Sequence, residues 1–353
     1  MKINSKRLEK TAQKFTALMI GRITEASRDW TKPWLAVKRK DYLPRNVTGR
    51  FYSGGNTLML LIYSMYYDFR TPVFLTFLQA SNLGIRINKG AQSFPVYHIA
   101  WMYYNARLQE RISIEKYEQL PETGKEDYYR IMTPKCYDVF NLDQTGYHEK
   151  YPQEWAELLC RHELSPEDKH QGNYTNPLLD AVITGQSWVC PIHERLSNRA
   201  YYSPGEDKIV LPYRTQFPDA QAFFAVALHE MTHSTGHESR LNRIKRGAAK
   251  GTDDYSREEL VAELSSALMG YYLGMETTIR EDHACYLRYW LDALEKDHGF
   301  LMDVLGDVIQ SVKYMCVQLE FNPFGEFVQP QPDTVTAKHH KEEVFKDELA
   351  IVD

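Results

Sequence analysis

The spacing of hydrophobic residues changes along this chain, and each spacing predicts a kind of element. In residues 5–26 apolar side chains recur every three or four positions, which predicts an amphipathic helix. Residues 57–67 are apolar enough for a buried helix, and VFLTFLQASNLG (residues 73–84) is expected to be a helix closed by its last glycine. The stretch from 85 to 104 predicts two strands around a turn at Lys89-Gly90. The first part of the chain is therefore expected to be α+β.

The pattern is sharper after residue 188. RAYYSPGEDKIVLP (residues 199–212) alternates around a PGED turn and predicts a hairpin. A helix is expected to begin near Asp219 and end near Gly236, because an N-capping residue and a glycine bound its apolar run. Three further helices are expected, the first beginning at Ser256, the second over residues 283–296 and the third over residues 300–317.

Composition indicates an ordinary globular protein. Hydrophobic residues make up 43% of the chain and charged residues 25%, so both halves can bury a core. No apolar run is long enough to span a membrane, and the first residues lack the apolar core of a signal peptide. The five cysteines are widely separated and form no CxxC pair, which favours a reducing compartment. We therefore expect a cytoplasmic protein with no membrane partner.

The charge is divided unevenly. Residues 1–120 carry 19 basic and 8 acidic side chains, a balance of +11, whereas the remainder carries 23 and 39, a balance of −16. Such a division suggests a module that binds a polyanion, joined to a part with another role. Chance distribution of solvated charge would give the same totals.

A metal-binding motif lies in the predicted helix LHEMTHSTGH. His229 and His233 are four residues apart, so both imidazoles project from one helix face and are well placed for tetrahedral zinc. Glu230 lies beside them, where it could take a proton from an attacking water and deliver it to a leaving amine. The sequence therefore predicts a zinc metallopeptidase-like site, which could also accept another divalent metal.

The third metal ligand has two candidates in the helix SREELVAELSSALM. Glu259 and Glu263 lie one turn apart on the same face. In one interpretation Glu259 binds the metal and Glu263 supports a histidine ligand from behind. In the other, Ser256 and Glu259 form a capping box, which turns Glu259 toward its own backbone and leaves Glu263 for the metal.

The hairpin before the active-site helix has a second expected role. Its edge strand could pair with an extended peptide, and Tyr201 or Tyr202 could donate a hydrogen bond to a tetrahedral oxyanion. Simple packing of these tyrosines is the alternative.

A basic and aromatic stretch occupies residues 30–105. Single-stranded nucleic acid needs this mixture, because aromatic faces stack on bases and cations follow the phosphates. The alternative is that the aromatics form a core with cations at its rim. The stretch includes Trp30, Trp34, Tyr42, Phe51, Tyr52, Tyr97, Trp101 and Tyr103, with Lys38, Arg39, Lys40, Arg45, Arg50, Arg86 and Lys89 between them.

Several motifs resemble the ArdC family of plasmid antirestriction proteins. PRNVTGRFYSGGN and LTFLQASNLGIRINKGAQSFPVYH resemble that family's N-terminal single-stranded-DNA-binding domain. AYYSPGEDKIVLP, LHEMTHSTGHESRLNR and EELVAELSSALMGYYLG resemble its zincin-like domain. The chain also resembles Spartan-type proteases, although their third ligand is a histidine. Both families join a zincin to single-stranded-DNA binding.

The resemblance implies a protein of a mobile element that protects incoming single-stranded DNA during conjugation. Its partners would be single-stranded DNA and either DNA-bound protein substrates or restriction enzymes. By the same resemblance, DNA contacts fall on Arg45, Asn46, Arg50, Tyr52, Arg86 and Lys89. Two other functions stay open, namely protection by binding alone with an idle metal site and a peptidase with no DNA role.

Together these patterns predict an α+β protein of two domains. The expected division is a single-stranded-DNA-binding domain over residues 1–125, a junction over 126–185, a zincin-like domain over 186–325 and an acidic tail over 326–353.

Overall fold

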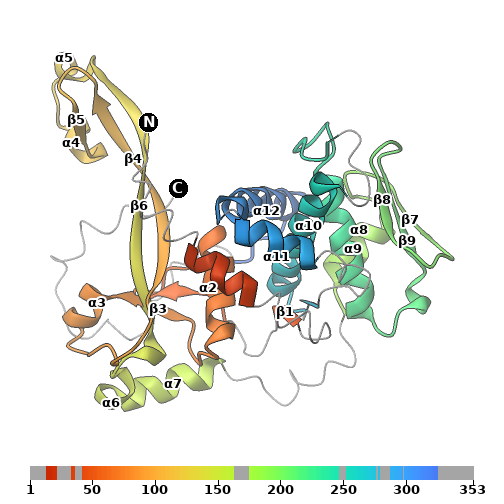
Figure 1. The fold of residues 1–353 in the computed structure, drawn as a ribbon, viewed down its shortest axis with the longest axis horizontal. Helices are drawn as coiled ribbons and strands as arrows, with labels where there is room; N and C mark the ends of the chain where they lie inside the picture. Colours follow the sequence, from red (N-terminus) through yellow and green to blue (C-terminus); the bar gives the residue numbers. More distant parts are fainter. Residues whose placement is uncertain are drawn as a thin grey trace.

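A computed structural model describes most of the chain. The described residues are 13–21, 33–35, 42–162, 175–245, 252–275, 277–278, 287–296 and 298–324. The predicted acidic tail, the ends of the first predicted helix and the start of the helix expected over residues 283–296 lie outside them. The described chain has the expected α+β, two-domain architecture (Figure 1).

The N-terminal half is built on a five-stranded sheet of order β2-β3-β6-β4-β5. Helices cover both faces near β3, because its residues alternate between two cores. Phe74 packs in the main core, while Val73 and Leu75 pack in a smaller one. The elements of this half are β2 (Arg45–Asn46), α2 (Gly55–Tyr66), β3 (Val73–Thr76), α3 (Phe77–Asn82), β4 (Phe94–Asn105), β5 (Glu110–Ile112), α4 (Ile114–Glu118), α5 (Glu122–Lys125), β6 (Tyr128–Asn141), α6 (Tyr147–Lys150) and α7 (Pro152–His162).

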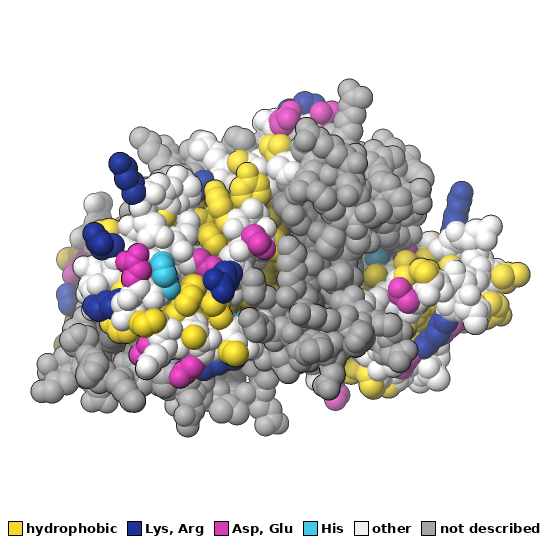
Figure 2. Space-filling model, turned by 90° about the horizontal axis from the view of Figure 1, so that it is seen from below, with side chains coloured by type: hydrophobic (Ala, Val, Ile, Leu, Met, Phe, Trp, Pro, Cys, Tyr) yellow, Lys and Arg dark blue, Asp and Glu magenta, His cyan; other side chains and the backbone are white. Residues whose placement is uncertain are grey.

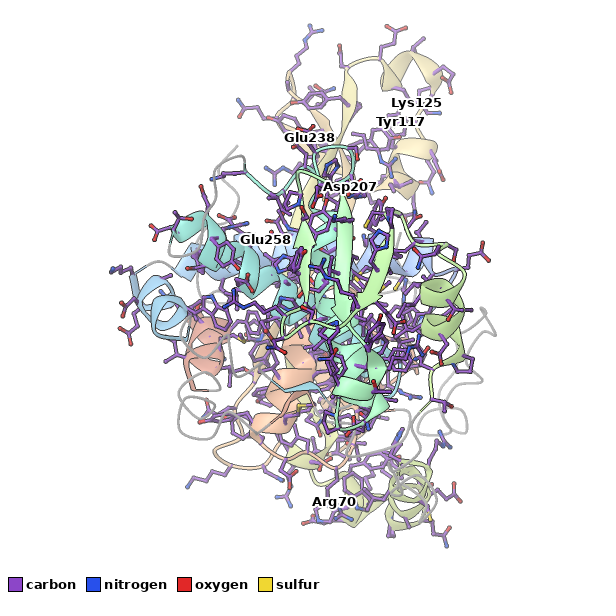
Figure 3. The ribbon with its side chains drawn as sticks, turned by 90° about the vertical axis from the view of Figure 1, so that its right-hand side faces the viewer. Arg70, Tyr117, Lys125, Asp207, Glu238 and Glu258 are labelled. Carbon is purple, nitrogen blue, oxygen red and sulfur yellow. The ribbon has the colours of Figure 1, made fainter. Side chains whose placement is uncertain are left out.

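Strands β4 and β6 form a long antiparallel hairpin that rises from the body as an arm (Figure 1). Its tip carries β5, α4 and α5, and the rings of Tyr103 and Tyr117 stack there with centroids 3.4 Å apart. Figure 3 shows Tyr117 and Lys125 at this end of the molecule and Arg70 at the opposite end.

Two predicted elements of this half were wrong. Residues 73–76 form β3 rather than the start of a helix, because Thr76 caps α3 through a capping box with Gln79. The strand expected before the Lys89-Gly90 turn is also absent from the described sheet, and Ile87 makes only an isolated bridge to Thr145 outside it. The partner of β4 is β6, from much later in the chain.

The expected junction over residues 126–185 needs correction. Residues 128–141 form the central strand β6 of the N-terminal sheet, since they pair with both β3 and β4. Helix α8 (Pro177–Thr184) belongs to the other half, where its Leu179 and Ile183 are buried in the main core. The sequence did not reveal this strand, because its pairing partners are distant in the chain.

The C-terminal half places helices against a three-stranded sheet of order β7-β9-β8. The predicted hairpin is confirmed as β8 and β9, which pair antiparallel. The remaining elements are β7 (Ile192–Arg195), β8 (Tyr201–Ser203), β9 (Lys208–Pro212), α9 (Ala220–Thr235), α10 (Asp253–Tyr272), β10 (Thr277–Thr278), α11 (Leu287–Lys296) and α12 (His298–Gln318).

One hydrophobic core runs through both halves. It contains residues from β4 and α2 as well as from α9, α10 and α12. Strand β1 (Pro33–Leu35) pairs with β10, and the Tyr271 hydroxyl donates to the Tyr42 carbonyl across the same boundary at 2.8 Å. The two halves are therefore fused by packing and by backbone pairing.

Local capping explains where the two central helices begin. Asp219 caps α9 by accepting from the Ala222 amide, and the helix ends before Gly236, as predicted. Helix α10 begins earlier than expected, because Thr252 caps it at Tyr255. Ser256 is therefore inside the helix, and the alternative in which Ser256 and Glu259 form a capping box is wrong. Within the described helices, none combines the length and apolar character needed to cross a bilayer.

Candidate metal centre

Helices α9 and α10 bring five candidate side chains together in the interior. His229, Glu230, Glu259 and Glu263 are each no more than 3% exposed, and His233 is only slightly more open. Glu263 lies near His229, whereas Glu258 lies near His233, so the two helices run in opposite directions past each other.

Three candidate ligand groups converge at this point. The Nε2 atoms of His229 and His233 are 3.0 Å apart; Oε2 of Glu259 lies 3.5 Å from the first, and Oε1 of Glu259 lies 3.7 Å from the second. One ligand atom from each residue lies within 4.8 Å of the other two. Glu263 faces a different atom, Nδ1 of His229, at 3.7 Å.

The outer nitrogens of both histidines face carboxylates. Nδ1 of His233 lies 3.1 Å from Glu258, and Nδ1 of His229 faces Glu263. A proton held at each Nδ1 leaves the Nε2 lone pairs facing each other and the Glu259 oxygens. Buried acceptors that face one another in this way are stabilised by a cation between them.

The close approach of these side chains shifts the pKa values of His233 and Glu259. Burial lowers the pKa of His233, but the charges and hydrogen bonds of Glu259 and Glu258 outweigh it and raise the pKa to about 10. Burial would raise the pKa of Glu259, yet His233 and His229 hold it well below its usual value. The cluster therefore holds positive charge strongly, as a proton or as a metal ion.

The residues fit a small divalent ion. Zinc bound at about 2.0–2.1 Å in a tetrahedron places neighbouring ligand atoms roughly 3.3–3.4 Å apart. The closest approaches recorded between the three groups, 3.0 Å between the two Nε2 atoms and 3.5 and 3.7 Å from them to the two Glu259 oxygens, span that value. Two imidazoles and one carboxylate also form a ligand set that leaves a fourth position open for substrate or water.

A cavity of about 770 Å³ opens onto this cluster and is lined by Glu230 as well as by the three candidate ligands. Strand β8 and the start of α10 contribute Tyr201, Tyr202 and Tyr255 to the wall. The cavity is large enough to hold a segment of a peptide beside the metal position.

The two hairpin tyrosines differ in their surroundings. Tyr202 is buried, donates its hydroxyl to Asp207 at 2.7 Å and accepts from Arg240. The proton of this hydroxyl is thus already donated to Asp207, which argues against Tyr202 as the donor to an oxyanion. Tyr201 accepts a hydrogen bond from Arg195 at 2.7 Å, on the exposed side of the hairpin.

The candidate nucleic-acid residues are spread over several elements. Trp34 lies on β1, which pairs with β10 and not with the sheet that holds Arg45 and Asn46. Asn46 closes a turn by accepting from the Thr48 and Arg50 amides. Its side-chain oxygen therefore has a structural role.

The other candidates divide into packed and exposed side chains. Arg45 lies over the Phe51 ring at 4.8 Å, and Tyr52 packs edge-on against Phe74. Arg86 and Lys89 are exposed in the segment between α3 and β4. Figure 2 shows Lys and Arg side chains among acidic and hydrophobic ones over the described part of the lower face, not as one continuous basic patch.

Two residues of the site were missed from the sequence. Glu258 precedes the candidate ligand Glu259, and Arg243 lies in the loop after α9. Arg243 holds both Glu258 oxygens, at 2.6 and 2.8 Å. The paired glutamates of the EEL motif were visible in the sequence, but nothing local indicated which acid the arginine would meet.

The fold and the site define a protein with a zincin-like domain joined to a second α+β domain. A family model described as a zincin-like metallopeptidase matches residues 181–304, and one described as the N-terminal domain of anti-restriction factor ArdC matches residues 9–140. The crystal structures of the antirestriction ArdC protein from plasmid R388, metal-free and Mn(II)-bound, are similar throughout. Each has a TM-score of 0.61 and 26% identity, and the metal-free structure covers 88% of this chain and 98% of that one. The chain belongs to the ArdC family.

Curated relatives extend this picture. Two DNA primases TraC of Escherichia coli are 29% and 26% identical over 79% of this chain, but the match spans only 18% and 24% of their length. The chain thus corresponds to about a fifth of those proteins. The uncharacterized protein y4eC of Sinorhizobium fredii is 26% identical, over 87% of this chain and 91% of its own length.

Proposed function

We propose that this protein is a single-stranded-DNA-binding antirestriction protein of a mobile element whose second domain is a zinc metallopeptidase. The observation that carries the proposal is the buried cluster of His229, His233 and Glu259, with Glu230 beside it on an open cavity. A structural metal site would need no glutamate at that position and no cavity. The Mn(II)-bound relative supports a divalent ion, and the nitrogen-rich ligand set favours zinc among such ions.

Each residue then has a chemical role. His229, His233 and Glu259 would hold the ion. When bound, the ion would act as a Lewis acid that polarises the scissile carbonyl. Glu230 takes a proton from the attacking water and passes it to the leaving amine. Glu263 supports His229 from its outer nitrogen.

The sheet beside the cavity supports a peptide substrate. Strand β8 is an edge of its sheet, and its Tyr201 and Tyr202 line the cavity. An extended peptide that adds to this edge would bring one of its bonds to the metal position. Proteins bound to DNA, or restriction enzymes, are the substrates that this arrangement suits in an antirestriction protein.

A role on single-stranded DNA is supported by the N-terminal domain. That domain is shared with ArdC, and its half of the sequence carries the basic excess. The name DNA primase of the TraC relatives fits a domain used near DNA. Among the candidate contacts, which are Trp34, Arg45, Asn46, Arg50, Tyr52, Arg86 and Lys89, the exposed Arg86 and Lys89 are best placed to meet phosphates. In this proposal the protein acts in the cytoplasm of the cell that receives DNA by conjugation.

The DNA role is tested by binding to fluorescent single-stranded and duplex oligonucleotides of equal length across a salt series, with and without chelator. We expect a preference for single strands that is indifferent to chelator, and a smaller salt slope after Arg86→Ala with Lys89→Ala. Arg107→Ala with Lys116→Ala, two exposed cations at the arm tip, is the matched control. Equal affinities of the wild type and both double variants for single-stranded DNA would show that Arg86 and Lys89 do not contact DNA.

The peptidase role is tested by Glu230→Gln. The variant should bind metal and single-stranded DNA as the wild type does but lose proteolysis, and it should lose protection of transferred DNA against restriction. Full protection by this variant would instead mean that the protein acts by binding alone.

A further inference from the structure

A carboxylate outside the ligand set holds one of the candidate metal ligands. Glu258 Oε1 lies 3.1 Å from Nδ1 of His233, on the side of the ring away from the ligand atom Nε2. Glu258 directly precedes Glu259 on α10. These two successive residues therefore approach opposite sides of the same imidazole, that of His233. The direction in which His233 presents its ligand nitrogen therefore depends on where the Glu258 carboxylate is held.

The Glu258 carboxylate is held by a buried arginine. The side chain of Arg243 is only 4% exposed, and it grips Glu258 with two hydrogen bonds, from Nε at 2.6 Å and from Nη2 at 2.8 Å. This bidentate geometry fixes the plane of the carboxylate as well as its position.

The same arginine is fixed by three further acceptors. Its Nη2 donates to the Thr232 carbonyl at 3.1 Å, and its Nη1 donates to the hydroxyls of Thr235 at 3.2 Å and Ser311 at 2.7 Å. All five N–H groups of the guanidinium thus have an acceptor. Lysine, with its compact ammonium group, could not reproduce this pattern.

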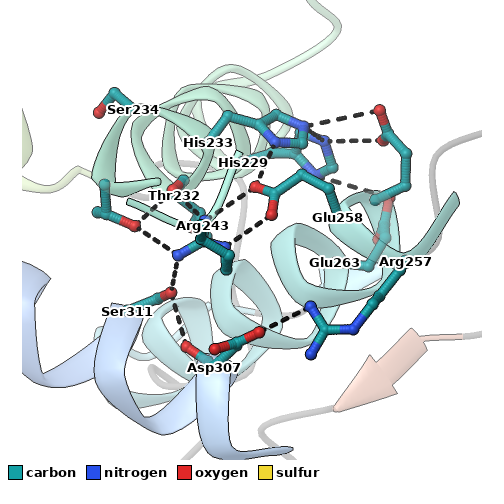
Figure 4. Close-up of polar contacts among 12 residues, drawn as sticks. His229, Thr232, His233, Ser234, Arg243, Arg257, Glu258, Glu263, Asp307 and Ser311 are labelled. Carbon is teal, nitrogen blue, oxygen red and sulfur yellow. Dashed lines mark hydrogen bonds and ion pairs between the residues drawn. The ribbon is translucent and has the colours of Figure 1, made fainter. Parts of the chain in front are cut away.

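The network reaches a third helix. Ser311 on α12 donates to the Asp307 carbonyl, and the Asp307 carboxylate pairs with Arg257 of α10 at 2.7 Å (Figure 4). Arg243 therefore sits where α9, α10 and α12 meet, and it ties the end of the metal-binding helix to the helix that bears Glu259.

We propose that Arg243 is a positioning residue of the metal centre, acting through Glu258 to orient the imidazole of His233 toward the ion. This inference rests on the proposed metal site. Removing the arginine leaves the three ligands in place but frees the ring of His233 to turn. The metal should then bind more weakly although its ligands are unchanged.

A neighbouring arginine provides the control. Arg240 is also buried and also binds a carboxylate, since its guanidinium holds Asp207 and donates to the Ser234 carbonyl. Its hydrogen bonds go to the β8–β9 hairpin and to the end of α9, rather than to the candidate metal ligands His229, His233 and Glu259. Loss of Arg240 should therefore cost stability in the same way without reorienting a ligand.

The test measures Zn²⁺ affinity of the full chain by competition with a chromogenic chelator, for Arg243→Lys, Glu258→Gln and Arg240→Lys. Thermal unfolding of the metal-free proteins is measured in parallel. We expect Arg243→Lys and Glu258→Gln each to weaken zinc binding by roughly 10- to 100-fold. The double variant should be little worse than either single one, because both act through the same contact. Arg240→Lys should lower the unfolding temperature but leave zinc affinity within about twofold of the wild type.

Two results would overturn the positioning role. One is wild-type zinc affinity in both Arg243→Lys and Glu258→Gln, and the other is an equal loss in Arg240→Lys, which would indicate a general loss of stability. His233→Ala separates this failure from failure of the metal site itself. If the wild type binds zinc and His233→Ala does not, the metal site is supported independently of the result for Arg243. If neither protein binds zinc, both the metal site and the positioning role are contradicted.

Discussion

Two glutamates that lie one turn apart on α10 face different nitrogen atoms of the candidate histidine ligands. Glu259 faces the Nε2 atoms of both histidines, whereas Glu263 faces Nδ1 of His229. In the proposed site, the nitrogen that each carboxylate approaches assigns Glu259 as the ligand and Glu263 as the support. Spacing on a helix cannot make this distinction, because both residues lie on the same face.

Substitution of these two residues should have unequal effects. Glu259→Gln removes an anionic ligand and should weaken zinc binding by more than about 100-fold, whereas Glu263→Gln removes support alone and should weaken it by roughly 10-fold. The measurement is zinc affinity by chelator competition. A larger loss in Glu263→Gln would reverse the two assignments.

A second prediction at this scale concerns Asp207, which Arg240 and Tyr202 both hydrogen-bond; we call these three residues the hairpin clamp. The hydrogen bonds from Arg240 and Tyr202 hold the pKa of Asp207 below its ordinary value. A carboxyl with a lowered pKa in the folded state stabilises the fold above its unfolded pKa of about 3.9 and loses that contribution as the pH falls through the lower folded value.

Asp207→Asn should therefore lower the free energy of unfolding at pH 7, and the difference from the wild type should shrink as the pH falls below about 4. Urea unfolding at several pH values, in the presence of chelator, measures it. Glu206→Gln, on the exposed neighbour that pairs with Lys208, is the control and should change little. A difference that stays constant down to pH 2 would contradict the clamp.

At the scale of elements, α2 packs closely against β4 and α12 at Gly55. A Cβ at Gly55 would collide with the Tyr97 hydroxyl and come within 2.9 Å of Leu305 on α12. Beside it, Asn56 pairs with Tyr97 as a strand would, donating to its carbonyl at 2.6 Å and accepting from its amide at 3.1 Å. The absence of a side chain at Gly55 allows the helix to approach the strand this closely.

Gly55→Ala should destabilise the protein by about 1–3 kcal/mol, because the added methyl group overpacks this junction. The matched control is Gly306→Ala on α12, where a Cβ would meet nothing within 4 Å. That change should stabilise by about 0.5–1 kcal/mol through helix propensity. Chemical denaturation of both variants checks the signs, and stabilisation by Gly55→Ala would show that the junction is looser than described.

Prediction from sequence succeeded where local signals bound an element. Asp219 and Gly236 delimit α9 in the sequence as they do in the structure, and the PGED turn correctly indicated the β8–β9 hairpin. It failed where pairing is distant, since β6 reaches its partner β4 across the whole arm tip. The contact of Arg243 with Glu258 was hidden for the same reason, because it forms only when a loop packs against a helix.

Over the whole molecule, the two family domains share one core. The main cluster of buried residues takes side chains from α2 and β4 as well as from α9, α10 and α12. The pairing of β1 with β10 adds a backbone link between the N-terminal segment and the zincin-like half. The sequence indicated two modules, and the structure adds that they are packed as one unit.

The whole chain should therefore unfold in one cooperative transition. Differential scanning calorimetry of the metal-free protein should give a single peak with equal calorimetric and van't Hoff enthalpies. A fragment that begins at residue 175 should be much less stable, because it exposes the core surface that α2 covers. Two resolved transitions would contradict the shared core.

The most direct measurement of the metal centre is a crystal structure with zinc, with anomalous data collected at the zinc absorption edge. We expect one strong anomalous peak at about 2.0–2.2 Å from Nε2 of His229, Nε2 of His233 and a carboxylate oxygen of Glu259, with Glu230 beside the open position. A peak bound by Glu263 or Glu258 in place of Glu259, or no peak between the two histidines, would contradict this expectation.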